Sequence, residues 1–345
     1  MYVEVFTAVS AFQQLDTEWQ HLLTRLPWQS VFHTPQWHEN WWRHFGQAHE
    51  LRLLAVRADD GTLQGLAPFM TSATAENPSR LALIGDLEVC DYLDILMLPA
   101  YQQEVAHTLV SYLVAQGGED MELYLPNLSQ HSPTRALLQA QLQQHGLTVE
   151  IEQIETCPTI VLPADWESYL TLLRGKDRHE LRRKIRRAET SVRLEYRVTT
   201  TASQLDADIE IFIALHRMSQ QAAKQDFMTP TKTAFFRDMA QQLWPHGWLE
   251  LAFLYADGEP IAALCCFTYG STYAAYNSGY HPAYAELSGG IVLFAHCIGR
   301  AIARGCTAFD FLRGNESYKY RFGATDQPLY QLLARTACPV QGSHL

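Results

Sequence analysis

The sequence of 345 residues has little of what marks several common protein classes. Its seven cysteines are odd in number and include no Cys-x-x-Cys pair, so we expect reduced core residues rather than a disulfide framework or a metal site. It has no Gly-Lys-Ser/Thr phosphate-binding loop, no serine nucleophile elbow and no strong metal motif. The sequence therefore gives no support to a P-loop nucleotidase, a serine hydrolase or a metalloenzyme.

Positive charge is also scarce outside one segment. The formal net charge is −11, which argues against a generally nucleic-acid-binding surface. The N-terminus lacks the basic and apolar regions of a signal peptide, and no uninterrupted apolar stretch is long enough to span a bilayer. We expect a cytoplasmic protein without an integral membrane segment.

Two stretches of the sequence share a pattern that indicates an internal repeat. The stretches LRLLAVRADDGTLQGLAPF (51–69) and LELAFLYADGEPIAALCCF (249–267) each predict two strands joined by an Asp-Gly turn. Each is followed by another strand and then by a helix, at about 101–116 and 290–304. A short strand (121–125 and 308–312), a further helix and a final strand follow.

We therefore predict an α/β (α+β) chain of two tandem units, residues 1–163 and 164–345. Each unit would be a mixed, mostly antiparallel sheet flanked by helices. A long helical segment near 164–187 would join them.

Ionisable side chains gather where one predicted strand leads into a helix, in the segment AFDFLRGNESYKYRFG (308–323). Gly314 breaks the strand, Asn315 is a good helix N-cap, and residues 316–319 would form the first turn. Free backbone N–H groups in a first turn favour anions. This segment is the predicted site of chemistry.

The order of these elements resembles the GNAT superfamily of N-acetyltransferases. Four stretches more specifically resemble the CelD/BioF-like acetyltransferase domain, over about residues 165–325. They are LRGKDRHELRRKIRRAE (173–189), Phe-x-x-Leu-His (212–216), NSGY (277–280) with LSG (287–289), and DFLRG (310–314) with Tyr318-Lys319. Tandem units also resemble the FemABX group, which transfers amino acids from aminoacyl-tRNA to cell-wall precursors.

The resemblance implies transfer of an acyl group from acetyl-CoA or another acyl-CoA to an amine or hydroxyl. The donor would bind at Ser288, Gly289 and Gly290, with Tyr280 nearby, because the first N–H groups of the following helix can cradle a pyrophosphate. A glycine-rich helix entry without a ligand is the alternative. The superfamily's usual Gln/Arg-x-x-Gly-x-Gly/Ala spacing is absent here.

For each predicted catalytic residue, a purely structural role is the alternative. A phenol near a departing thiolate can act as a general acid, so Tyr318 could serve, or could simply pack on Phe322. Arg313 and Lys319 could hold phosphate or carboxylate, while Asp310 and Glu316 could act directly or only neutralise them. The full set of predicted catalytic residues is Asp310, Arg313, Glu316, Tyr318, Lys319 and His216.

His216 shares a helix face with three apolar residues, Ile209, Phe212 and Ile213. A histidine at such a position is a buried core residue or a base that faces a cleft between the units. In the N-terminal unit, PNLS (126–129) stands where the C-terminal unit has RGNE (313–316). The N-terminal unit is therefore interpreted as degenerate.

Residues 174–187 contain eight Lys or Arg and two acidic residues. This basic segment can be a solvated flank whose apolar side, with Leu181 and Ile185, packs inward. It can also contact the acidic remainder of the chain, coenzyme A phosphates, tRNA or an anionic membrane surface. No aromatic residue interleaves the run, which weakens the case for single-stranded RNA.

Taken together, the sequence predicts an acyl-CoA-dependent N-acyltransferase without a metal. Its acceptor would be a small molecule or a cell-envelope precursor. A FemABX-like aminoacyl-tRNA-dependent transferase, with tRNA as a less favoured partner, and a non-catalytic binding or scaffold protein are the alternatives.

Overall fold

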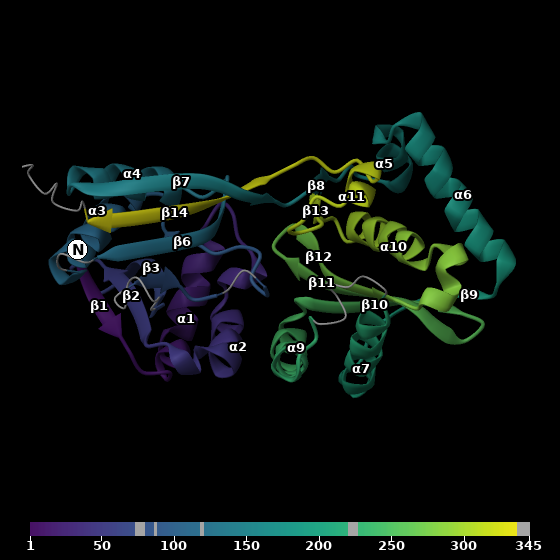
Figure 1. Cartoon of the computed structure of the whole chain (residues 1–345), viewed down its shortest axis with the longest axis horizontal. Helices are drawn as coiled ribbons and strands as arrows, with labels where there is room; N and C mark the ends of the chain where they lie inside the picture. The colour runs from purple at the N-terminus through teal and green to yellow at the C-terminus, as the bar shows by residue number, and fades with distance from the viewer. Residues whose placement is uncertain (73–79, 86–87, 118–120, 220–226, 337–345) are drawn as a thin grey trace, which may run out of the picture. The chain divides into compact units, whose positions relative to one another are not determined.

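The computed structural model describes residues 1–72, 80–85, 88–117, 121–219 and 227–336. The chain divides into two compact units. Unit 1 comprises Met1–Glu155 and Pro328–Leu345, and unit 2 comprises Thr156–Gln327. Each unit is a mixed sheet with helices packed on it (Figure 1), which confirms the predicted fold class.

The sheet of unit 1 has the order β1-β2-β3-β4-β6-β14-β7, with β5 paired to β3. The pairs are antiparallel from β1 to β4 and between β6 and β14, whereas β4 and β6 are parallel. The strands are β1 (Tyr2–Phe6), β2 (Leu51–Arg57), β3 (Leu63–Thr71), β4 (Leu81–Leu83), β5 (Leu96–Met97), β6 (Glu122–Ser129), β7 (Leu147–Thr156) and β14 (Pro328–Thr336).

The helices of unit 1 follow from local signals. In α2 the Thr34 side chain accepts a hydrogen bond from the N–H of Trp37, and Pro35 takes the first position, where its missing N–H costs nothing. Trp37 and Trp41, one turn apart, are buried. The helices are α1 (Ala11–Thr24), α2 (Pro35–Phe45), α3 (Gln102–Gly117) and α4 (Thr134–Gln144), with 3-10 turns η1 (Val31–His33) and η2 (Gly46–Ala48).

The sheet of unit 2 has the order β8-β13-β12-β11-β10-β9. Its strand pairs are antiparallel except for β12 with β13. The strands are β8 (Thr159–Val161), β9 (Leu194–Val198), β10 (Leu249–Ala256), β11 (Glu259–Tyr269), β12 (Thr272–Tyr280) and β13 (Ala308–Asp310).

In unit 2 the helices α7 and α9 lie on one side of the sheet and α10 lies on the other (Figure 1). The helix α6 in turn packs on α10, so it forms an outer layer. The helices are α5 (Trp166–Leu172), α6 (Gly175–Ser191), α7 (Ala202–Met218), α9 (Pro230–Leu243), α10 (Gly289–Ala303) and α11 (Ser317–Arg321), with 3-10 turns η3 (Trp244–His246) and η4 (Pro282–Leu287).

The predicted hairpin repeat is present in both units, as β2–β3 and β10–β11. In the second hairpin Asp257 and Gly258 make a two-residue turn with positive φ angles of 52° and 93°, which is the turn that Asp-Gly favours. The predicted helices at 101–116 and 290–304 appear as α3 and α10, each shifted by one residue.

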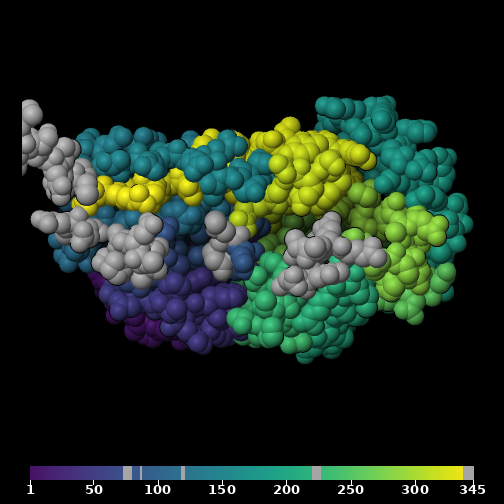
Figure 2. Space-filling view, viewed as in Figure 1, coloured from purple at the N-terminus to yellow at the C-terminus, as the bar shows by residue number. Residues whose placement is uncertain are grey.

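The division of the chain differs from the expected boundary at residue 163 and at the C-terminal end. Strand β14 pairs with β6 in unit 1, for example Leu333 with Tyr124, and its yellow residues form a band flanked by those of the teal segments in Figure 2. Strand β8 pairs with β13 in unit 2, with Ile160 opposite Phe309. Unit 2 is therefore inserted between β7 and β14 of unit 1.

The predicted helical segment near 164–187 is two helices rather than one. Leu173 has extended backbone angles, φ −73° and ψ 143°, and ends α5. Leu173 and Leu181 are buried in the core of unit 2, and Ile185 packs against that core. The apolar side of the basic segment therefore faces inward, as expected for an amphipathic helix.

The six cysteines in the described part of the chain are buried and not in disulfides. This matches the expectation of reduced core residues, while Cys338 lies outside the described residues. Within the same residues, no helix has both the length and the apolar character needed to cross a membrane.

Candidate active site

A cavity of about 410 Å³ opens in unit 2 where two parallel strands separate. Strands β12 and β13 are paired only from Thr272 to Ala274 and from Ala308 to Asp310. Beyond this point β12 continues to Tyr280, whereas the chain after Asp310 leaves the sheet. The cavity lies between the free part of β12, the segment 311–319 and the start of α10.

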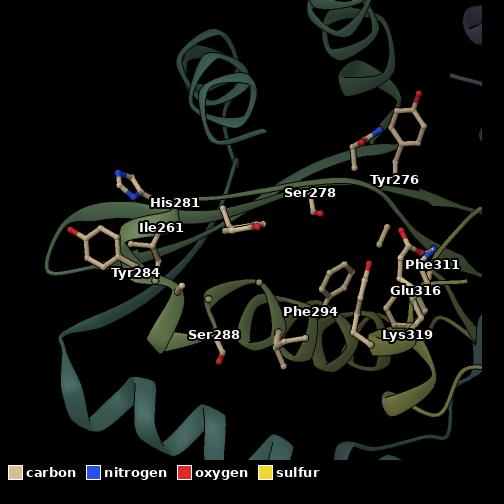
Figure 3. Close-up of a pocket in the computed structure, with 18 of the residues that line it drawn as sticks. Ile261, Tyr276, Ser278, His281, Tyr284, Ser288, Phe294, Phe311, Glu316 and Lys319 are labelled. Atoms are coloured by element: carbon tan, nitrogen blue, oxygen red, sulfur yellow. Dashed lines mark ion pairs between the residues drawn. The ribbon is translucent and has the colours of Figure 1, made fainter. Parts of the chain in front are cut away.

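Figure 3 shows how the labelled side chains surround this space. Ser278 of β12 and Phe294 of α10 face each other across it. Phe311, Glu316 and Lys319 lie at one end, and the other end holds Ile261, His281 and Tyr284.

The β12 wall is shaped by a β-bulge. Cys265 pairs with Asn277, but the next residue, Cys266, pairs with Ala275, so Tyr276 is an extra residue in β12. A bulge redirects side chains and locally ends regular pairing. Tyr276, Asn277 and Ser278 are consecutive residues of the cavity lining, but the Tyr276 ring points away from the space and stacks on Phe236 of α9.

The start of α10 offers free backbone donors to the cavity. Ser288, the N-cap, has a left-handed backbone with φ 54°, and the first N–H that its carbonyl accepts is that of Val292. Among the described residues, no acceptor is found for the N–H groups of Gly289, Gly290 and Ile291. A helix start of this kind binds anions, since its N–H groups and dipole both favour negative charge.

The two glycines differ in the space around them. A Cβ on Gly289 would lie 3.2 Å from Ile261, whereas a Cβ on Gly290 would meet nothing within 4 Å. Ser288, Gly289, Gly290 and Tyr280, the residues predicted to bind the donor, all line the cavity.

Tyr318 lines the cavity between two aromatic rings. Its ring centroid lies 5.4 Å from that of Phe294 and 6.2 Å from that of Phe311. No group in the described part of the chain hydrogen-bonds its hydroxyl. Burial, with the nearby Glu316 carboxylate, raises the pKa of Tyr318 above its usual value. The phenol therefore stays protonated at neutral pH and can donate a proton.

Lys319 also borders the cavity, but its ammonium is fully engaged by the protein. The side chain is 3% exposed. Its Nζ donates to the carbonyl oxygens of Leu312, Arg313 and Gly314 at 3.1, 2.8 and 2.9 Å and lies 2.9 Å from Glu316 Oε2. An ammonium has three donors. Lys319 thus holds the segment before α11 in place and has no donor left for a ligand.

The helix α11 begins one residue later than predicted. Glu316, not Asn315, is the N-cap residue, and the helix has 5 residues. Tyr318 and Lys319 are still in its first turn, but so short a helix is not an anion site by itself. Arg313 and Glu316 line the cavity beside them.

Two predicted catalytic residues do not line the cavity. Asp310 is buried, and its Oδ1 accepts the N–H of Leu312 at 2.7 Å. His216 is buried on α7, and its Nε2 lies 3.3 Å from Oδ1 of Asn277, which does line the cavity. Both residues position others rather than face the open space.

Sequence reasoning missed part of the site. Asn277 and Ser278 stood in a recognised motif, but no pattern showed that a bulge would place them in the cavity lining. Phe294 stood in no motif. A hydrogen bond between Arg187 Nη2 and Ser288 Oγ, at 3.1 Å, links the basic helix α6 to the start of α10.

No group of three or more potential metal ligands is found within the described residues. The site consists instead of a helix start with free N–H groups, a buried phenol and an aromatic wall.

Comparison with known proteins relates this site to one family. Residues 175–320 match the family model of the acetyltransferase (GNAT) domain. No curated protein sequence matches the chain.

Solved structures share the fold over almost the whole chain at low sequence identity. FemX has a TM-score of 0.64 at 12% identity, covering 96% of this chain and 97% of its own. L-PGS from Bacillus licheniformis has 0.57 at 13% identity, covering 94% and 93%. The C-terminal domain (DUF2156) of a proposed lysylphosphatidylglycerol synthetase from Agrobacterium fabrum has 0.58 at 11% identity, covering 94% and 92%.

At these identities the structural likeness shows the fold alone, while the family model identifies the domain that contains the cavity. Residues 175–320 are therefore similar to the acetyltransferase (GNAT) domain family, within a chain that has the fold of FemX.

Proposed function

We propose that the protein transfers an acyl group, acetyl or longer, from a coenzyme A thioester to an amine of a small molecule or cell-envelope precursor. The donor would lie along the cavity of unit 2, with its pyrophosphate at the start of α10 and its thioester near Tyr318. A hydroxyl acceptor would follow the same chemistry with a weaker nucleophile.

One observation carries this proposal: free anion-binding N–H groups and a protonated phenol border the same cavity. Gly289 to Ile291 provide the N–H groups, and Gly290 leaves room for a phosphate to approach the backbone. Tyr318 lies beside Phe294 and Phe311, and these two rings, with Ile261 at the other end of the cavity, supply apolar surface for a pantetheine chain.

The reaction would use this arrangement as follows. The neutral acceptor nitrogen attacks the thioester carbonyl, a C–N bond forms and the C–S bond breaks. The nitrogen loses a proton to solvent, and the departing sulfur gains one from the Tyr318 hydroxyl. The Tyr318 phenol is protonated at neutral pH and can therefore supply this proton, and the phenolate regains a proton from solvent.

The side chains behind the wall would set the geometry. The Nε2–H tautomer of His216 donates to Oδ1 of Asn277, which leaves the amide N–H groups of Asn277 as donors. Lys319 fixes the segment that carries Tyr318. Neither role requires contact with the reacting atoms.

The test is binding of acetyl-CoA, longer acyl-CoAs and free coenzyme A, measured by calorimetry and by the shift in melting temperature. Gly290→Glu would place a carboxylate at the proposed pyrophosphate site and should abolish binding. Gly175→Glu is the matched control, because nothing lies within 4 Å of that position either, and it should bind like the wild type. Absence of binding to every thioester would exclude a coenzyme A donor.

A second candidate function rests on the likeness to FemX over almost the whole chain. The FemABX group uses aminoacyl-tRNA, and the basic helix α6 could contact tRNA phosphates. Binding of this kind weakens steeply with salt because counterions are released. Binding of tRNA at low salt that is lost at 200 mM salt would favour this donor, and no binding at low salt would exclude it.

A further inference from the structure

Three cationic side chains meet beside the start of α10, outside the cavity. Lys184 and Arg187 lie one turn apart on α6, and Arg321 ends α11. We call Lys184, Arg187 and Arg321 the cation cluster. It lies on unit 2, whose α6 forms part of the surface in Figure 2.

The cluster is not neutralised by direct ion pairs among the described residues, although the Glu180 carboxylate is near enough to Lys184 and Arg187 to affect them. None of its three members forms an ion pair there, whereas their neighbours on α6 do: Arg182 contacts Glu167 at 3.1 Å and Arg183 contacts Glu180 at 2.7 Å. The basic run is therefore partly neutralised, and Arg187, one of its members without an ion pair, reaches the start of α10.

The cluster is also partly withdrawn from water. Burial lowers the pKa of Lys184, and the charges of Arg321 and Arg187 lower it further, against an opposing effect of Glu180. The Nε of Arg187 is buried and has no partner in the described part of the chain. Lys184 and Arg187 are partly buried, whereas Arg321 is exposed. Partly buried cations that repel each other are stabilised by a bound anion.

The position of Arg187 shows where that anion would lie. Its Nη2 donates to Ser288 Oγ at 3.1 Å, and the Ser288 hydroxyl points away from β12 in Figure 3, toward α6. The cluster therefore adjoins the free N–H groups of α10 on the side away from the cavity. An anion here would be a second group on a ligand already held at the start of α10.

We propose that the cation cluster binds a phosphomonoester, the 3′-phosphate of a coenzyme A donor whose pyrophosphate lies at the start of α10. This inference rests on the proposed function and adds to it a subsite for the nucleotide. A phosphomonoester carries about −1.5 to −2 charges at pH 7, which suits three clustered cations. Lys176, Arg178 and Arg186 of α6 also form no ion pair among the described residues, so the experiment includes a titration with tRNA.

The experiment compares coenzyme A with 3′-dephospho-coenzyme A by calorimetry. The proteins are the wild type, the double variant Lys184→Gln/Arg187→Gln, and the control Arg182→Gln, which changes a paired arginine on the same helix. The wild type and the control should bind coenzyme A about tenfold or more tightly than the dephospho form, since charge-assisted contacts are worth that factor. The double variant should bind both ligands equally and with the weaker affinity.

Three results would overturn the inference. Equal affinity of the wild type for both ligands would show that no group of the protein gains binding energy from the 3′-phosphate. A double variant that weakens both ligands by the same factor would place the cluster on the pyrophosphate or give it a structural role. A double variant that keeps the full preference, beside a Gly290→Glu variant that loses binding, would remove the subsite and leave the proposed donor in place.

Failure of the donor itself gives a different pattern. If the wild type binds neither form of coenzyme A, both the proposed function and this inference fail. The same wild type titrated with tRNA then shows whether the cluster serves RNA, because binding that the double variant loses would assign it to phosphodiesters.

Discussion

The ammonium of Lys319 donates a hydrogen bond to the main-chain carbonyl of Leu312, at 3.1 Å, across a turn in which Leu312 itself has a left-handed backbone with φ 55°. Leucine rarely adopts this conformation because its Cβ crowds the backbone, at about 1–2 kcal/mol. Two more carbonyls, of Arg313 and Gly314, share the same ammonium. The buried lysine thus stabilises a turn that the sequence disfavours.

Replacing Lys319 by methionine should destabilise unit 2 by about 2–4 kcal/mol, because three carbonyls lose a charged donor in a buried place. Urea unfolding would measure the change. The exposed Lys176→Met is the control and should have almost no effect. At a temperature where both variants are folded, only Lys319→Met should lose acyl transfer. An unchanged unfolding free energy would contradict the role assigned to this side chain.

Replacing Tyr318 by phenylalanine should lower kcat by about a hundredfold or more, since general acid catalysis contributes about 10²–10⁴. The melting temperature should not change, because no described residue forms a hydrogen bond with the Tyr318 hydroxyl. Tyr320→Phe, on the same helix, removes an exposed hydrogen bond to Asp326 and should leave kcat unchanged.

The pH dependence gives a second check on Tyr318. Because the pKa of this phenol is raised, the wild-type rate should show no loss between pH 7 and 10 from ionisation of Tyr318. A basic limb that appears below pH 10 and vanishes in Tyr318→Phe would show that the phenol ionises normally.

Gly279 should tolerate no side chain. A Cβ there would lie 2.3 Å from the backbone nitrogen of His216, where α7 crosses β12, so Gly279→Ala must push the helix away. We expect a loss of about 2 kcal/mol or more, measured by urea unfolding. Gly299→Ala, in the interior of α10, meets only Trp166 at 3.6 Å and should instead stabilise by about 0.5–1 kcal/mol.

Unit 1 should lose stability as the pH falls below 6.5. Burial lowers the pKa of His33 to about 3 and of His38 to about 4, so the unfolded chain takes up protons before the folded one does. At pH 5 each histidine should cost about 2 kcal/mol. Burial raises the pKa of Asp94 to about 6, and its protonation offsets a smaller part of this loss.

Urea unfolding of the full chain from pH 7.5 to 5 would measure this dependence. The variant His33→Leu should show a shallower slope than the wild type, and the exposed His21→Leu should keep the wild-type slope. A wild-type stability that does not change over this range would exclude neutral buried histidines as the cause of acid sensitivity.

The repeat could be predicted from the sequence because its signals are local. The Asp-Gly turn at 257–258 and the alternating strands around it lie next to each other in the chain, and so do the signals of α10. The partner of β14 could not be predicted in this way. Its alternation indicates a strand, but nothing in residues 328–336 says that Leu333 pairs with Tyr124 of unit 1 rather than with a strand of unit 2.

The same distinction between local signals and distant contacts applies to the candidate site. Sequence motifs identified the residues at the start of α10 and the tyrosine of α11, which the structure brings to one cavity. They did not separate Tyr318, whose hydroxyl has no partner among the described residues, from Lys319, whose donors are all used. That difference depends on the left-handed turn at Leu312, which no residue preference predicts.

Strand β14 lies between β6 and β7 in the sheet of unit 1, although it is encoded after all of unit 2. During synthesis the ribosome therefore releases every residue of unit 2 before the last strand of unit 1 exists. Until Pro328–Thr336 emerges, the edge strand β7 has no neighbour that joins it to β6 and the rest of the sheet. The sheet of unit 1, whose synthesis begins before that of unit 2, is therefore completed after unit 2 has been synthesised.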